Sequence, residues 1–375
     1  MRISNIKPRK ILDSRGFWTL ETTITTSEGI VAFASVPSGT STGKSEALAL
    51  QAYEAVSATE EIFLDIAGKE FDSQLDFDNE LIAQDGTSNK AKLGANSILA
   101  LSVAFCRAQA KSKNIPLYKH INEIGYFSGA LALPKLMMLM FEGGKHGSGS
   151  IDFQELMYVT ESVDEGVLLY QKIKNHLEDE HLSTQVGLEG AFSPRELTNV
   201  KALKIMSRIS PITPISLDIA QSSRTGRGID FAKLFNDHKL FSVEDPYGEE
   251  AWSDWTSINK LYQSKVMVVG DDLTTTNPTR IQRAIDENCI SGVIIKPNQI
   301  GTVSETLTAI NLAKSAGLAV IVSHRSGETN DDFIADLAVG AEANYVKFGA
   351  PSRGERVAKY NRLITIQGEL FQTIA

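Results

Sequence analysis

Apolar runs in the second half of the chain recur at an even spacing, and each ends on a residue that can take part in chemistry. The runs PISL, LFSV, VMVVG, GVII, AVIVS and NYV are followed by Asp218, Glu244, Asp271, Lys296, His324 and Lys347. By subtraction, successive endpoints lie 26, 27, 25, 28 and 23 residues apart. This is about the length of one buried strand, one amphipathic helix and two short connections. The pattern predicts a β/α barrel.

These endpoints matter because the strands of such a barrel run parallel and their C-terminal ends open at one mouth. Three acidic and three basic side chains are therefore predicted to share one pocket. The plainer explanation is that any α/β domain repeats at this period and that some residue must end each strand. That explanation suffices for one endpoint but not for all six together.

The first third of the chain shows a different pattern. Residues 20–26 (LETTITT) and 30–36 (IVAFASV) alternate between apolar and polar positions, which predicts an antiparallel hairpin. Residues 93–110 carry apolar side chains at helical spacing. We predict an α+β capping domain over residues 1–128 and a modified eight-stranded β/α barrel, of the TIM type, over residues 129–375.

The charge composition of the chain limits which kinds of partner it can bind. The chain has 46 acidic and 37 basic residues, a net charge of -9 and a pI near 5.3, which argues against binding of nucleic acid or of an anionic membrane surface. The most apolar stretch, residues 131–141, is too short to span a bilayer and contains Lys135. Cys106 and Cys289 lack cysteine or histidine partners at ligand spacing, so we interpret both as core thiols and expect a cytoplasmic protein.

Residues 39–45 read GTSTGKS and resemble a phosphate-binding P-loop at first sight. That loop needs four residues between its first glycine and the Gly-Lys pair, and here there are three, with Pro37 interrupting the approach from the strand. We therefore expect a loop that closes over a polar ligand, with glycines as the hinge and hydroxyl groups as contacts.

The acidic endpoints Asp218, Glu244 and Asp271 would bring three carboxylates together, and such hard oxygen ligands suit Mg²⁺. Three like charges in one layer would repel each other strongly without a cation. The alternative is that each carboxylate caps a following helix. Asp272, next to Asp271, is predicted to support the site or to cap a helix.

The basic endpoints suggest a base and an anion site. A lysine held near cations can lose enough proton affinity to act as a base, so Lys296 and Lys347 are candidates, although a strand-end lysine is usually a surface group. The run His324, Arg325, Ser326 supplies donors that would attract a phosphate or a carboxylate.

Further candidates lie in loops. Glu189 stands between glycines in GLEGA, which would let a tight backbone excursion aim a general acid into a cleft. Glu155 in FQE and His146 in GGKHGSG are similar cases. For each of them a surface loop is an equally good explanation.

Taken together, these stretches resemble the enolase family. The resemblance runs nearly end to end, through ILDSRG, VPSGTSTGKSEA, DGTSNKAKLGANSILALS, FQE, VEDP, VGDDLTTTNP, IIKPNQIGT, SHRSGET and KFGAPSRGERVAKYN. It implies an Mg²⁺-dependent lyase that interconverts 2-phosphoglycerate and phosphoenolpyruvate in glycolysis, a fold with an N-terminal α+β cap on an eight-stranded barrel of irregular order, and a homodimer.

The resemblance also implies residue roles. Asp218, Glu244 and Asp271 would hold a structural Mg²⁺, and Ser41 would help to bind a second Mg²⁺ that arrives with the substrate. Lys296 would remove the C2 proton, while the metals and Lys347 stabilise the resulting dianion.

The same resemblance assigns the remaining steps and contacts. Glu189, assisted by Glu155, would protonate the departing C3 hydroxyl, with His146 also in the catalytic group. The residues implied to contact the substrate or to lie at the edge of its site are His146, Gln154, Glu155, Lys296, His324, Arg325, Ser326 and Lys347.

The chain departs from the family pattern in three motifs. Where family sequences usually read SRGNP, NGGxHA and GDEGG, this chain has SRGFW, EGGKHG and GLEGA. Leu188 removes a carboxylate next to Glu189, and Glu142 adds one nearby. These changes leave two alternatives open: an enzyme of this fold with altered substrate or weakened activity, and a protein that binds partners without catalysis.

Overall fold

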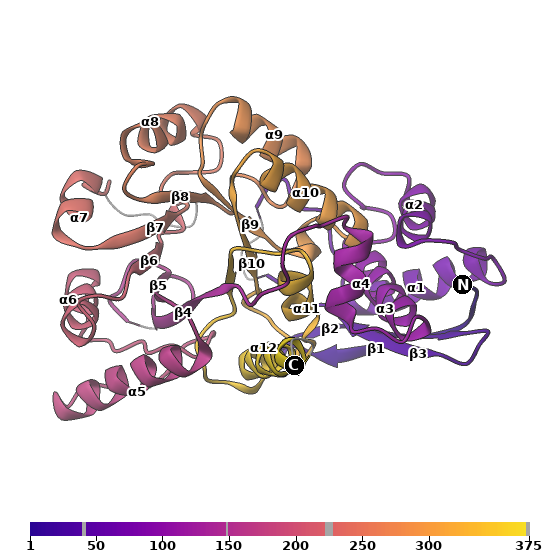
Figure 1. Ribbon diagram of the computed structural model, residues 1–375, viewed down its shortest axis with the longest axis horizontal. Helices are drawn as coiled ribbons and strands as arrows, with labels where there is room; N and C mark the ends of the chain where they lie inside the picture. The colour runs from indigo at the N-terminus through magenta and orange to yellow at the C-terminus, as the bar shows by residue number, and fades with distance from the viewer. Residues whose placement is uncertain (40–42, 148, 222–227, 373–375) are drawn as a thin grey trace.

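The computed structural model describes residues 1–39, 43–147, 149–221 and 228–372. It contains an N-terminal unit beside a barrel (Figure 1). The N-terminal unit is an antiparallel sheet of order β1-β2-β3, covered by helices. Its elements are β1 (Ile3–Leu12), β2 (Trp18–Thr26), β3 (Val31–Ser35), α1 (Ala52–Ile66), α2 (Gln74–Asp85), α3 (Ala95–Ser112) and α4 (Leu117–Ile124).

The predicted hairpin is confirmed as β2 and β3, and the predicted helix over 93–110 is confirmed as α3. Helix α3 is buried on nearly every side because it packs on strands β2 and β3 and also on helix α4 and α10 of the barrel. The predicted boundary between residues 128 and 129 falls in the connection between α4 and β4.

Eight strands form a closed barrel of order β10-β11-β4-β5-β6-β7-β8-β9, so the predicted barrel is confirmed. Its strands are β4 (Lys135–Glu142), β5 (Glu155–Thr160), β6 (Ile215–Asp218), β7 (Leu240–Glu244), β8 (Met267–Gly270), β9 (Gly292–Ile295), β10 (Ala319–Ser323) and β11 (Tyr345–Lys347). Its helices are α5 (Val163–Asp179), α6 (Asn199–Ile209), α7 (Phe231–Asp237), α8 (Trp252–Tyr262), α9 (Pro278–Asp286), α10 (Val303–Ser315), α11 (Phe333–Gly340) and α12 (Gly354–Gln372), with a short 3₁₀ helix η2 (Pro297–Gln299).

One strand runs against the others. Strand β5 pairs antiparallel with both β4 and β6, whereas the other neighbouring pairs of the barrel are parallel. The first residue of β5 therefore lies where the other strands have their last. In the β5–β6 register Glu155 faces Asp218, and in the β4–β5 register it faces Glu142.

Successive side chains along a barrel strand point to opposite sides of the barrel wall. On β4, Met137 and Leu139 belong to a small apolar cluster with Ile294 and Ile321, while Leu136 and the other alternate residues join the large cluster under the helices. Both cysteines are buried free thiols, as predicted. Among the described residues no helix is long and apolar enough to cross a membrane.

Candidate active site

The six strand-end residues converge as the spacing predicts. Asp218, Glu244 and Lys347 are the last residues of β6, β7 and β11, and the other three follow directly after β8, β9 and β10. The pocket at this mouth has a volume of about 530 Å³ and is lined by most of the predicted site residues: His146, Gln154, Glu155, Glu189, Asp218, Asp271, Lys296, His324, Arg325, Ser326 and Lys347. Ser41 lies outside the described residues.

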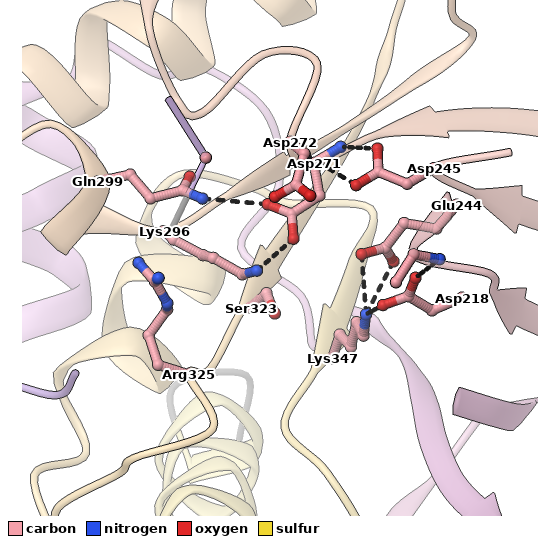
Figure 2. Close-up of polar contacts among 12 residues, drawn as sticks. Asp218, Glu244, Asp245, Asp271, Asp272, Lys296, Gln299, Ser323, Arg325 and Lys347 are labelled. Carbon is pink, nitrogen blue, oxygen red and sulfur yellow. Dashed lines mark hydrogen bonds and ion pairs between the residues drawn. The ribbon is translucent and has the colours of Figure 1, made fainter. Parts of the chain in front are cut away.

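The buried ammonium group of Lys347 links carboxylates from three strands, and Figure 2 shows its contacts with Asp218 and Glu244. Lys347 Nζ lies 2.9 Å from Asp218 Oδ2, 2.9 Å from both oxygens of Glu244 and 3.1 Å from Glu155 Oε2. Lys347 and these three carboxylates are almost completely buried. The ammonium group and the carboxylates therefore interact strongly, because charges inside a protein are poorly screened.

The second predicted base faces the remaining acidic endpoint. Figure 2 shows Lys296 pointing at Asp271, with which it forms an ion pair. Gln299 Nε2 donates to the other oxygen of Asp271 at 3.1 Å. Burial lowers the pKa of Lys296, but the neighbouring carboxylates, Asp271 first and then Glu244, together outweigh burial and raise that pKa above its usual value. With carboxylate partners, the pKa of Lys347 is raised as well. The lower proton affinity expected for a lysine held near cations stays a prediction.

The pocket carries an excess of negative charge. Among the described residues that line it, seven are acidic and three are lysine or arginine. Burial and neighbouring carboxylates raise the pKa values of Glu155 and Glu244 well above their usual range. Burial and Asp271 raise the pKa of Asp272 to about 7. Carboxylates in this condition suit a divalent cation, because a cation would favour their ionised forms.

Asp245 organises the acidic edge of the pocket. Its two oxygens accept hydrogen bonds from the backbone N–H groups of Asp271 (3.0 Å) and Asp272 (2.9 Å). Oxygens of Asp245, Asp271 and Asp272 lie within 4.8 Å of one another, a spacing that could hold a metal ion. Asp272 does not cap a helix, since the N-cap of α9 is Asn277.

Glu189 lies in the pocket between two histidines. Its oxygens are 3.4 Å from His146 Nδ1 and 3.3 Å from His324 Nε2. Burial alone would raise the pKa of Glu189, but His146, His324 and Arg356 outweigh it and hold that pKa well below its usual range. Leu188 therefore does not draw the glutamate out of the cleft.

Arg356, on α12, orients His324. Its Nη1 lies 2.9 Å from His324 Nδ1, and because arginine can only donate, that ring nitrogen must accept. Burial, together with Arg356, lowers the pKa of His324 to about 3, so the ring is neutral. The ring proton then resides on Nε2, which faces Glu189.

Two of the predicted anion-binding residues, Arg325 and Ser326, are buried in the wall of the pocket. Arg325 pairs with Glu46 at 3.0 Å and donates to Asn298 Oδ1 at 2.8 Å. The backbone carbonyl of Ser326 accepts from Arg356 at 2.7 Å. Arg325 and Ser326 both line the pocket, as the SHRSGET motif predicts.

Sequence reasoning missed three residues of this site: Glu46, Asp245 and Arg356. Each lies inside a stretch that resembles the enolase family, in TSTGKSEA, VEDP and RGERVAKYN. None stands at a regular strand-end position, so spacing gave no signal for them.

A β/α barrel with a reversed strand, buried lysines and a carboxylate cluster at its mouth defines a class of barrel enzymes that work on anionic substrates. Residues 3–121 match the enolase N-terminal domain, and residues 130–223 and 227–375 match the enolase C-terminal TIM barrel domain. The chain is similar to the enolase of Bifidobacterium animalis subsp. lactis (strain AD011), with 40% identity over 99% of this chain and 96% of that protein. The enolases of Natranaerobius thermophilus and Elusimicrobium minutum are each 39% identical over 98% of this chain and 96% of their own. The chain belongs to the enolase family, and the predicted lyase class and fold are confirmed.

Proposed function

We propose that the mouth of the barrel interconverts 2-phosphoglycerate and phosphoenolpyruvate with the help of Mg²⁺. The observation that carries this proposal is that Lys296 and Glu189 face one pocket, which also contains a cluster of buried carboxylates. A base and an acid are both needed, because the reaction removes a proton from C2 and a hydroxyl group from C3.

In the forward direction, the lone pair of Lys296 Nζ takes the C2 proton. Lys347 lines the same pocket and contributes positive charge to the forming carboxylate dianion. Glu189, assisted by His146, passes a proton to the C3 hydroxyl, which leaves as water while the double bond forms. The proton comes from Glu155, whose pKa is raised well above its usual range beside the ionised Glu189. Gln154, His324, Arg325 and Ser326 bind and orient the substrate.

The residues fit Mg²⁺, which favours hard oxygen ligands. Asp218, Glu244 and Asp271 would hold the first ion, and Ser41 would take part in binding a second ion with the substrate. Bound Mg²⁺ supplies the positive charge that makes a proton beside a carboxylate acidic enough to remove. By pairing with Asp271 it would also remove the charge that raises the proton affinity of Lys296.

The test is an activity assay on the purified protein. With Mg²⁺ present, 2-phosphoglycerate should give a product with the ultraviolet absorbance of an enol phosphate, and chelation should stop the reaction. Lys296→Ala should lower kcat by at least about 1,000-fold, because it removes the base. The matched control is Lys233→Ala, an exposed lysine on α7. A protein that turns over no 2-phosphoglycerate at any Mg²⁺ concentration would contradict the proposal.

The same purified protein can test the two alternatives, an enzyme with an altered substrate and a protein that binds partners without catalysis. Mg²⁺ binding without 2-phosphoglycerate turnover, together with turnover of another α-hydroxy acid, would indicate an altered substrate. Calorimetry that detects no Mg²⁺-dependent affinity for 2-phosphoglycerate would indicate a protein that binds partners without catalysis.

We also propose a cytoplasmic homodimer, because membership of the family favours both. Light scattering should give about twice the chain mass of 40.9 kDa. Fractionation of the source cells should place the protein in the cytoplasmic fraction.

A further inference from the structure

Glu142 is a buried carboxyl group that ties two loops of the mouth together. It is the last residue of β4, and its side chain is completely buried. Its Oε2 accepts a hydrogen bond from Glu189 N at 3.0 Å, and its Oε1 accepts from Ala191 N at 2.9 Å. One carboxyl group therefore fixes the backbone on both sides of Gly190, in the loop that carries the proposed acid.

Glycines pack closely against Glu142: Gly187 leaves the space for its side chain, and Gly147 lies against its backbone. A Cβ added at Gly187 would lie 2.5 Å from Glu142 Cδ, and one at Gly147 would lie 2.5 Å from the backbone oxygen of Glu142. Both distances are far below van der Waals contact. Any side chain at Gly187 would therefore push the Glu142 carboxyl group away from the backbone it holds.

The charge of Glu142 is linked to that of Glu189. Burial, then Glu189, raises the pKa of Glu142 to about 8, against the backbone hydrogen bonds and Arg356, which act to lower it. Oxygens of Glu142 and Glu189 lie within 4.8 Å of each other. The ionisable and charged groups that face Glu142 from the surrounding elements are His146, Glu155, Tyr170, Glu189 and Arg356.

The sequence departures fit this arrangement. Family sequences usually carry asparagine at position 142 and aspartate at position 188, and this chain has Glu142 and Leu188. The carboxyl group next to the proposed acid has thus moved from the loop itself to the neighbouring strand. Leu188 keeps a backbone contact, since its N–H donates to His146 O at 3.1 Å.

We propose that Glu142 is a positioning residue for Glu189: its two carboxyl oxygens hold residues 189–191 against the end of β4. The inference rests on the proposed function, because it acts through the proposed role of Glu189 in removing the C3 hydroxyl. It also explains how Leu188 can stand beside the acid without loss of the site.

The experiment separates the two halves of the reaction. Removal of the C2 proton by Lys296 can be followed as exchange of the C2 hydrogen of 2-phosphoglycerate with deuterated water, by NMR. Loss of the C3 hydroxyl is followed as net formation of phosphoenolpyruvate. A residue that acts through Glu189 should affect net formation and leave the exchange intact.

Glu142→Gln replaces the carboxyl group with an amide of nearly the same shape. We expect kcat for net turnover to fall about 10- to 100-fold, because the side chain of Glu189 is displaced. Exchange at C2 and KM should change less than about 3-fold. We expect an ionisation near pH 8 in the pH profile of kcat for the unchanged protein, and Glu142→Gln should lose it. The matched control is Glu161→Gln, an exposed glutamate just after β5.

The double variant Glu142→Asn with Leu188→Asp carries the residue types usual for the family. It should recover most of the turnover that Glu142→Asn alone loses, which also guards against a variant that fails to fold. Unchanged turnover and pH profile in Glu142→Gln, or equal loss of exchange and turnover, would overturn the positioning role. An unchanged protein that is itself inactive would instead overturn the proposed function.

Discussion

At the scale of the residue, Lys347 decides the charge balance of the site. Its ammonium group contacts Asp218, Glu244 and Glu155 from three strands. In Lys347→Met the three carboxylates lose this partner, so we expect the metal-free protein to lose about 3–5 kcal/mol of unfolding free energy. Mg²⁺ should restore part of that loss, since it binds the folded state.

Urea unfolding in chelator and in Mg²⁺ measures both quantities for Lys347→Met. The control is Lys233→Met, whose partner Asp237 is an exposed residue of the same helix, and it should change neither. A variant as stable as the unchanged protein in chelator would show that the carboxylates balance their charges without Lys347.

Single residues were predictable where strand geometry dictates their place. Asp218, Glu244 and Lys347 follow apolar runs directly, so their convergence follows from the parallel direction of the strands. Asp245 and Arg356 could not be found this way. Asp245 acts by accepting backbone hydrogen bonds from the next strand end, and Arg356 reaches the site from a helix distant in sequence.

At the scale of the element, helix α9 connects the strand before Asp271 to the strand before Lys296. Its N-cap is Asn277, whose Oδ1 accepts from Thr279 N at 2.9 Å and from Arg280 N at 3.4 Å. Asn277→Ala should lower the unfolding free energy by about 1 kcal/mol, because it leaves helix N–H groups without a partner. Asn277→Ser keeps an acceptor and should cost much less. Urea unfolding compares the two, and equal losses would contradict the capping role.

The reversed strand β5 is the element that the spacing could not predict. A strand that enters the barrel from the mouth carries its functional residue first, so Glu155 precedes its apolar run and breaks the rule that identified the other endpoints. Strand β5 runs antiparallel to β4 and β6. The pattern of hydrophobic residues shows where a strand lies but not in which direction it runs through the barrel. Sequence reasoning offered Glu155 only as a loop carboxylate, and the family resemblance gave it a role in the site.

At the scale of the whole molecule, the N-terminal unit and the barrel share buried polar contacts. Asp78 on α2 accepts a hydrogen bond from Ser304 N at the start of α10, and Ser102 on α3 accepts from Val303 N. Arg107 on α3 pairs with Asp331 in the loop before α11. The sequence predicted two units, but not these contacts, because each joins residues more than 200 positions apart.

Asp78 gives this contact a dependence on pH. Burial raises the pKa of Asp78 from 3.8 to about 6, although Ser102, Ser304 and Gln74 hydrogen-bond to it. The folded protein therefore binds this proton more tightly than the unfolded chain, so the contribution is stabilising below pH 4 and is lost as pH rises from about 4 to 6. The shift corresponds to about 3 kcal/mol.

Asp78→Asn removes the proton-binding group but keeps an oxygen that can accept from Ser304 N. Across pH 4 to 6 the variant should gain about 3 kcal/mol of unfolding free energy relative to the unchanged protein, since only the latter must ionise a buried carboxyl group. Urea unfolding at intervals between pH 4 and 7 measures the difference, with Asp179→Asn, exposed on α5, as the control. Parallel curves for Asp78→Asn and the unchanged protein would mean that Asp78 titrates alike in the folded and unfolded chains, and the contact between α2 and α10 would then be insensitive to pH.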